Sequence, residues 1–359
     1  MNKFKVGTNF DFEMLKKINE LNKFSKKNKI TELYGSVRLD AKYAARPDFR
    51  LPDISRFDLE QYVQKARKYD IKFNYTLNSI NPCGSKQSLY DSAESFKNLI
   101  IYLYGIGVER VTVSNPVLLE LIREINKNIE IEISTISHVD TISQIRYYHE
   151  TYGVNKICNN LNKNRDFKWL KKAAKYCNEN GIELELMVNE FCGVGGKDYS
   201  THCIYRDSCY ICHSTNRTTE DALLLNNYPM RLCSESRNEN PANWLRVKFI
   251  RPEDIRYYNN IGIENFKITG RTGSSEYLEK VISAYLNESF DGNLIELWKP
   301  LESIAENKDE KFTVHNIPNK QLFGFIDKFT DEEHNCDYEV CGQTCRYCEN
   351  FYLNIGGKK

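Results

Sequence analysis

Hydrophobic and polar positions along the chain follow two patterns in turn. Short runs rich in Val, Ile, Phe and Tyr, typical of strands, alternate with stretches whose apolar residues recur at helical spacing. The strand-like runs predict eight strands, at 3–9, 30–37, 71–78, 109–115, 129–137, 154–160, 182–190 and 263–270. The amphipathic stretches predict helices at 11–27, 58–69, 92–104, 116–127, 140–151, 166–179, 252–261 and 275–287.

The alternation of strands and helices indicates a parallel α/β sheet, because each strand needs a crossover helix to reach its parallel neighbour. Eight such units favour closure into a (β/α)₈ TIM barrel. An open doubly wound sheet is the alternative, weakened because no glycine-rich dinucleotide-binding loop follows any predicted strand. We expect a TIM-like barrel over residues 1–290 with a cysteine-rich insertion at 191–245 after the seventh strand. A small cysteine-rich C-terminal appendage would occupy 291–359.

The loop after the last predicted strand is a candidate anion site. TIM barrels often bind phosphate near the ends of strands seven and eight, at the N-terminus of a helix. Here the segment reads GRTGSS, in which glycines allow close backbone approach and an arginine can fork onto a carboxylate or phosphate. An ordinary capped helix with a solvated arginine is the alternative. The candidate residues are Lys267, Arg271, Ser274 and Ser275.

Composition narrows the class of protein. Hydrophobic residues make up 41% of the 359, enough for a sizeable core, and 50 basic residues balance 49 acidic ones. The net charge of +1 gives no overall attraction to nucleic acid, although a local basic patch remains open. No run is apolar enough for a signal peptide or a membrane span, so we expect a cytoplasmic protein without a membrane partner.

Twelve cysteines are many for such a chain, and in a reducing compartment clustered cysteines indicate metal or redox chemistry. Five lie in the predicted insertion, whose length points to a functional loop. Thiolates select iron–sulfur clusters or zinc, and the scattered spacing favours a 4Fe–4S cluster over a zinc site built from two close pairs. Free thiols are a third interpretation. The candidates are Cys192, Cys203, Cys209, Cys212 and Cys233, with Cys83 or Cys158 as other possible fourth ligands.

The C-terminus carries a second compact set of cysteines. A Cys-x₃-Cys-x₂-Cys run within it resembles the radical-SAM signature, but that signature follows the first strand of its barrel, whereas this run lies near the C-terminus. We interpret the set as a second metal site, either an auxiliary cluster or zinc. Reduced thiols in a loosely structured tail are the alternative. The four candidates are Cys336, Cys341, Cys345 and Cys348.

Several segments between about residues 180 and 287 resemble peptidase family U-32, the collagenase-like family. ELMVNEFC is similar to the strand that leads into that family's first cluster cysteine, and YPMRLCSESR to the stretch around its later cysteine and arginine. The run from IRPEDI to SAYL is similar to its closing helix, strand and helix. Thr269 stands where the family pattern Lys-Ile-Glu-Gly-Arg has an acidic residue, and Arg256 stands where some members have a cysteine.

The resemblance implies a TIM barrel with a 4Fe–4S centre more firmly than it implies proteolysis. Cys192, Cys203 and Cys233 match by position, and Cys209 or Cys212 is the natural fourth ligand. We therefore expect a redox enzyme, such as an oxygen-independent hydroxylase, acting on an anionic small molecule, an RNA or a peptide. An electron donor and a partner subunit of the same family would accompany it. The alternatives are a metal-dependent peptidase and a non-catalytic protein whose metals staple loops.

Overall fold

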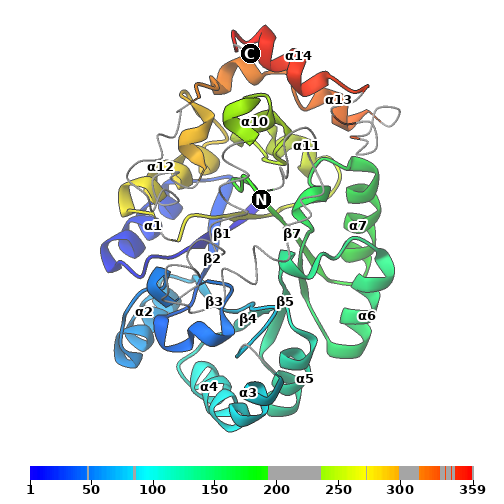
Figure 1. The fold of residues 1–359 in the computed structure, drawn as a ribbon. Coiled ribbons are helices and arrows are strands. Elements are labelled where there is room, and N and C mark those ends of the chain that lie inside the picture. The colour runs from blue at the N-terminus through cyan, green and yellow to red at the C-terminus, as the bar shows by residue number, and fades with distance from the viewer. Residues whose placement is uncertain are drawn as a thin grey trace.

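A computed structural model describes residues 1–46, 48–83, 86–192, 236–271, 273–298, 315–331, 336, 341 and 344–357. Eight parallel strands pair in chain order and close where β8 meets β1, so the predicted (β/α)₈ barrel is confirmed (Figure 1). The strands are β1 Asn2–Gly7, β2 Asn28–Gly35, β3 Lys72–Leu77, β4 Arg110–Val113, β5 Glu130–Ile133, β6 Lys156–Cys158, β7 Glu183–Met187 and β8 Asn265–Ile268.

Helices cover the outside of the barrel and mostly begin at side-chain caps. Asp11 and Ser55 each accept a hydrogen bond from the first turn that follows them, and Thr141 forms a reciprocal capping box with Gln144. The surrounding helices are α1 Phe12–Phe24, α2 Arg56–Lys68, α3 Lys86–Asp91, α4 Ala93–Gly105, α5 Pro116–Ile125, α6 Ile142–Tyr152, α7 Phe167–Glu179, α10 Asn243–Arg246, α11 Ile255–Asn259 and α12 Ser275–Leu286.

Two helical segments differ from the sequence prediction. The expected helix at 252–261 is a 3₁₀ turn, Pro252–Asp254, followed by the five-residue helix α11. Proline at the first position and an Arg251–Asp254 ion pair of 2.7 Å hold this turn. Helix α3 was not predicted, because it is short and lies in a polar stretch with no apolar periodicity.

Buried charged side chains fill part of the barrel interior, where such barrels usually have layers of aliphatic side chains. Lys156 Nζ lies 2.7 Å from Glu32 Oε2 and 2.8 Å from Glu185 Oε1. Lys5 Nζ lies 2.7 Å from Glu185 Oε2 and also contacts Glu132. Each of these side chains is almost completely buried, so each charge depends on its partners. We refer to Lys5, Glu32, Arg110, Glu132, Lys156 and Glu185 as the ion-pair network.

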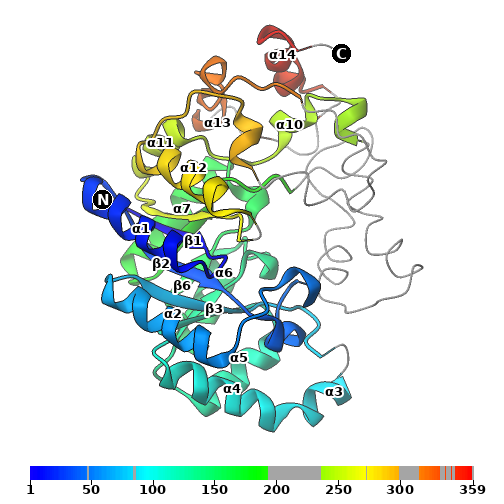
Figure 2. The same ribbon diagram turned by 90° about the vertical axis from the view of Figure 1, so that its left-hand side faces the viewer.

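The described part of the expected appendage shares the hydrophobic core of the barrel. Trp298 stacks on Trp244 at 5.5 Å between ring centroids, and Phe325 stacks on Phe249 at 6.1 Å. Helices α13 Asp327–Thr330 and α14 Tyr347–Asn354 lie near α10, at the top of both ribbon views (Figures 1 and 2). The segment therefore adds to the barrel core instead of forming a separate one.

No helix within the described ranges is long and apolar enough to cross a membrane. The predicted insertion lies largely outside those ranges, since residues 193–235 are not described.

Candidate functional site

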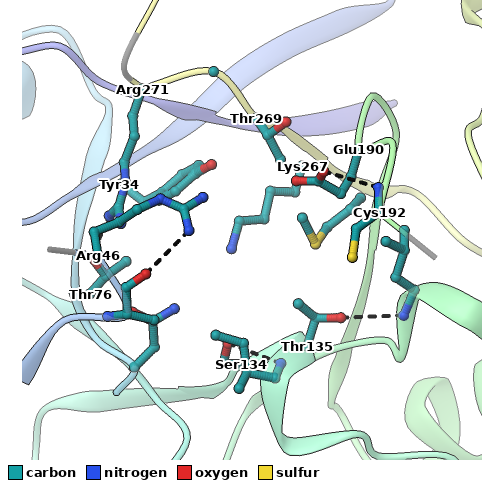
Figure 3. Close-up of a pocket in the computed structure, with 16 residues that line it drawn as sticks. Tyr34, Arg46, Thr76, Ser134, Thr135, Glu190, Cys192, Lys267, Thr269 and Arg271 are labelled. Atoms are coloured by element: carbon teal, nitrogen blue, oxygen red, sulfur yellow. Dashed lines mark hydrogen bonds between the residues drawn. The ribbon is translucent and has the colours of Figure 1, made fainter. Parts of the chain in front are cut away.

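A pocket lies at the mouth of the barrel, where the carboxyl ends of the strands meet (Figure 3). This is the face on which TIM barrels place their sites, because the loops that follow the strands converge there. Its lining residues are Tyr34, Ala45, Arg46, Thr76, Asn78, Ser134, Thr135, Ile136, Leu161, Met187, Glu190, Cys192, Lys267, Thr269, Gly270 and Arg271. The predicted residues Lys267, Arg271 and Cys192 are among them.

Two guanidinium groups enter the pocket from loops far apart in the chain. Arg271 follows β8, and its Nη1 donates to Thr76 Oγ1 at 2.9 Å and toward Ser36 Oγ at 3.4 Å. Burial, with the nearby Arg46 charge, lowers the pKa of Arg271 to about 10. Arg46 Nε is buried without a hydrogen-bond partner among the described residues. Arg271 is therefore still charged at neutral pH, and both guanidinium groups leave donor capacity for an anion.

A third positive charge lies between the two sides of the pocket. Lys267 Nζ is 4.4 Å from the centre of the Tyr34 ring and 3.8 Å from Glu132 Oε1. Burial alone would lower its pKa, but neighbouring acidic groups, with Cys158 and Glu132 foremost, raise it above the usual lysine value. Lys267 therefore remains an ammonium group at the pocket floor.

Glu190 and Cys192 occupy the opposite side of the pocket (Figure 3). Glu190 is the single carboxylate among the described lining residues, and its Oε1 accepts hydrogen bonds from the backbone N–H groups of Phe191 at 3.0 Å and Cys192 at 3.2 Å. These bonds hold the chain as it leaves β7. The Cys192 side chain packs against a buried group formed by Cys158, Leu161 and Met187.

The backbone beside Arg271 is shaped by a glycine. Gly270 has a φ of +127°, a conformation that side chains disfavour, and a Cβ there would lie 2.6 Å from Tyr277 Cε1. The chain can therefore turn tightly after β8 and aim Arg271 back over the barrel. This turn lets the Arg271 side chain reach Thr76 on β3.

Ser274 and Ser275 lie just beyond this turn and outside the pocket lining. Ser274 Oγ accepts from the backbone N–H of Tyr277 at 3.2 Å and so caps α12. Ser275 Oγ donates to Asp11 and accepts from Asn9 Nδ2 at 3.0 Å. The Ser274 hydroxyl thus caps its own helix, and the Ser275 hydroxyl joins the start of α12 to the loop after β1. Their predicted contact with an anion stays a prediction.

The cysteines expected in the insertion are placed only in part. Cys192 is described, whereas Cys203, Cys209, Cys212 and Cys233 lie outside the described residues. Cys158 lies beneath the pocket, where burial raises the pKa of its thiol to about 12. Cys83 is part of a loop after β3, and its backbone N–H donates to Lys42 O at 3.0 Å.

Three ligand-type atoms from Glu132, Cys158 and Glu185 lie within 4.8 Å of one another. Lys5 and Lys156 contact these carboxylates, and Lys267 lies close to Glu132. Because ammonium groups already neutralise both carboxylates and the thiol is held protonated, this cluster fits a buried ion-pair core better than a metal site.

Comparison with known proteins then gives the family. The model of peptidase family U32 matches residues 38–321. The chain belongs to peptidase family U32. An uncharacterised protease of the archaeon Methanocaldococcus jannaschii, MJ1657, is 29% identical to this U32 chain over 372 residues, which cover 99% of this chain and 98% of the relative. The predicted family is therefore confirmed.

Solved structures give weaker likenesses to this U32 protein. The U32 peptidase Mk0906 is 14% identical, with a TM-score of 0.43, and the match covers 75% of this chain and 92% of that one. A GH113 β-1,4-mannanase is 11% identical, with a TM-score of 0.42 and coverages of 79% and 98%. Barrels of one shape host many chemistries, so such scores say nothing of the reaction.

The C-terminal cysteines of the U32 chain lie beside basic side chains. Cys336 Sγ is 3.1 Å from Lys248 Nζ, and Cys345 Sγ is 3.5 Å from Lys328 Nζ. The backbones of Cys341 and Cys345 pair in an isolated parallel β-bridge, and Cys348 lies in the first turn of α14. The structure therefore describes all four of these candidates, although segments between them are not described.

Sequence reasoning missed Arg46, Tyr34 and Thr76. Tyr34 and Thr76 belong to strands that the hydrophobic pattern did identify, and each lies one residue before the last residue of its strand. Arg46 lies in an irregular loop after β2, where periodicity carries no signal. The unusual length of the stretch between β2 and α2 was the one available sign, because long loops at the carboxyl end of a barrel often form its site.

Proposed function

We propose that this U32 protein is an iron–sulfur redox enzyme that modifies an anionic substrate, by oxygen-independent hydroxylation or a related reaction. The observation that carries the proposal is the pocket itself, with three cationic side chains facing a thiol across one cavity. A single carboxylate lines the described part of this pocket. An anion would therefore complete the charge balance of the site.

Arg46 and Arg271 suit a phosphate or carboxylate because a guanidinium group donates two parallel hydrogen bonds to planar or tetrahedral oxyanions. Thr76 and Ser36 hold the Arg271 side chain in place from one side. Lys267 would contribute a point charge at the floor. A small anion, the phosphate of an RNA and the carboxylate of a peptide share this chemistry, so the cationic groups of the pocket suit all three.

Cys192 fits the role of cluster ligand by position, because its thiol lines the same cavity at the exit of β7 and begins the predicted cysteine-rich insertion. Glu190 fixes the backbone there by accepting two backbone N–H hydrogen bonds, and Met187 and Leu161 pack against the half-buried Cys192 side chain. When bound, a 4Fe–4S cluster would transfer single electrons, and in a hydroxylation it would accept them from the substrate held by the arginines. Its other proposed ligands are Cys203, Cys233 and either Cys209 or Cys212.

The peptidase alternative has less support in the described pocket. No histidine is among its described lining residues, so neither a Cys–His pair nor a histidine zinc site is formed there. Glu190, the one carboxylate in the described part of the lining, accepts hydrogen bonds from the backbone of the neighbouring residues.

The proposal can be tested by asking whether anion and cluster share one cavity. The anaerobically reconstituted, reduced protein would be titrated with inorganic phosphate while its electron paramagnetic resonance spectrum is followed. We expect phosphate to change the spectrum of the native protein and of Arg256→Gln, an exposed arginine outside the pocket. The change should be lost in Arg271→Gln. Metal-dependent peptide hydrolysis that persists without iron, in a protein whose spectrum ignores phosphate, would favour the peptidase alternative.

A further inference from the structure

Four cysteines from the C-terminal segment converge beside α10, the helix at the end of the predicted insertion. Cys348 Sγ lies 3.8 Å from the carbonyl oxygen of Leu245 in α10, and α10 packs against α14. Cys341 is buried and bridges to Cys345 through the backbone. Cys336 is joined to the same region through Lys248, three residues beyond Leu245. Residues more than 80 positions apart in sequence thus meet at one place.

Positive side chains surround this group of thiols. Lys248 and Lys328 reach two of the four sulfurs directly, at 3.1 and 3.5 Å. Arg165 is completely buried, and its guanidinium lies 4.4 Å from the centre of the Phe249 ring and 4.9 Å from that of Phe325. Its Nη1 donates to Leu245 O at 2.7 Å.

The buried guanidinium group of Arg165 also indicates negative charge near these thiols. Its Nε and Nη2 are buried and have no hydrogen-bond partner among the described residues. A buried guanidinium with unused donors calls for negative charge nearby. Four neutral thiols would not supply that charge, whereas four thiolates on a metal centre would. Basic side chains around the sulfurs are also how proteins tune such centres.

We propose that Cys336, Cys341, Cys345 and Cys348 ligate a second 4Fe–4S cluster. In tetrahedral zinc, with Zn–S bonds of about 2.3 Å, all four sulfurs stand within about 3.8 Å of one another. Among the described residues, the one trio of ligand atoms within 4.8 Å is Glu132, Cys158 and Glu185, so no three of these four sulfurs are that close. A cubane binds each thiolate at a different iron, so it does not need its sulfurs to lie that close together.

This second centre would connect to the pocket through a short series of contacts. Arg237 Nη2 donates to Phe191 O at 2.7 Å, next to Cys192, and its guanidinium lies 4.7 Å from the centre of the Trp244 ring. Trp244 precedes Leu245, whose carbonyl meets Cys348. The inference adds to the proposed function but does not depend on it, because the metal content of this set is measured without turnover.

The test starts from the full chain with Cys192, Cys203 and Cys233 all replaced by alanine, so that the first cluster cannot form. After anaerobic reconstitution with iron and sulfide, we expect this protein to keep about four irons and four sulfides per chain. Adding Cys345→Ser and Cys348→Ser should remove them, whereas adding Cys83→Ala should not. Zinc without sulfide, or iron that survives both serine substitutions, would overturn the assignment.

A second measurement covers the outcome in which the serine variants fail to fold. In the same triple-alanine background, Lys328→Gln removes one ammonium beside Cys345 without removing a ligand. We expect iron and sulfide to stay unchanged and the reduction potential to become more negative, because a nearby positive charge favours the reduced cluster. Lys320→Gln, an exposed lysine paired with Asp291 at 2.6 Å, is the control. An unchanged potential in Lys328→Gln would contradict the assignment.

Discussion

Arg46 and Arg271 come from loops more than 200 residues apart in the chain and face one pocket, with no carboxylate between them in the described lining. Burial is the main reason that the pKa of Arg271 falls to about 10, and the charge of Arg46 lowers it further. Two like charges held together in a cavity destabilise the protein unless an anion lies between them. Such an arrangement is typical of a binding site, in which a ligand supplies the missing charge.

Arg271→Met should therefore separate stability from binding. We expect a melting temperature equal to or above that of the native protein in anion-free buffer, because the substitution removes a buried, like-charged neighbour of Arg46. Phosphate should stabilise the native protein, by about 2.7 kcal/mol at a hundred times its dissociation constant. It should not stabilise the variant. The exposed Arg256→Met is the control, and loss of phosphate stabilisation there would indicate a nonspecific salt effect.

Gly270→Ala tests whether the turn after β8 positions Arg271. Its Cβ would overlap Tyr277, and its φ of +127° strains any side chain, so we expect a loss of about 1–3 kcal/mol and weaker phosphate binding. Gly181→Ala is the matched control, since its φ is +67° and no atom lies within 4 Å of its added Cβ. Equal effects of the two variants on phosphate binding would show that the Gly270 turn does not position the arginine.

Glu32→Gln should strongly destabilise the barrel. Lys156 and Arg110 both contact this carboxylate, at 2.7 and 2.9 Å, and both would lose a buried partner. We expect a loss of about 3–5 kcal/mol in the free energy of unfolding, measured by urea titration. Glu183→Gln is the control, because Glu183 pairs with the same two cations but its side chain is about one third exposed. A loss comparable with that of Glu32→Gln would refute the importance of burial.

The same carboxylate predicts how stability changes with pH. Burial alone would raise the pKa of Glu32, but Lys156 and Arg110 hold it well below the usual glutamate value. Its contribution is therefore complete above the unfolded pKa of about 4.3 and is lost as the pH falls below it. Urea titrations between pH 7 and 3 should show a steeper loss for the native protein than for Glu32→Gln. If the free energy of unfolding of the two proteins fell in parallel with pH, the stabilising role of the ionised Glu32 carboxylate would be contradicted.

Much of the fold could be predicted because strand and helix periodicities differ, and each strand core, such as the run ending at Met187, has a distinct apolar pattern. The ion-pair network was not predicted. Lys5 and Glu132 were visible inside predicted strands, but an alternating polar residue ordinarily faces solvent, and only barrel closure places these two side chains together.

The site was predictable where local motif and position agreed, as for Arg271 and Lys267 beside the last strand. It was not predictable where the chain folds back from a distance. Arg46 reaches the pocket from an irregular loop, and Ser275 is held by Asp11 from the other end of the chain. The local sequence does not indicate such contacts, because they form only when the strands close into a barrel.

The most direct test of the central claim is the metal content of the protein purified without oxygen, compared with the Cys192, Cys203 and Cys233→Ala triple variant. We predict that the variant loses about four irons and four sulfides per chain relative to the native protein. Cys177→Ala, which removes a buried thiol from α7, should lose none. Zinc without sulfide in the native protein, or iron and sulfide unchanged in the triple variant, would contradict a cluster at the mouth of the barrel.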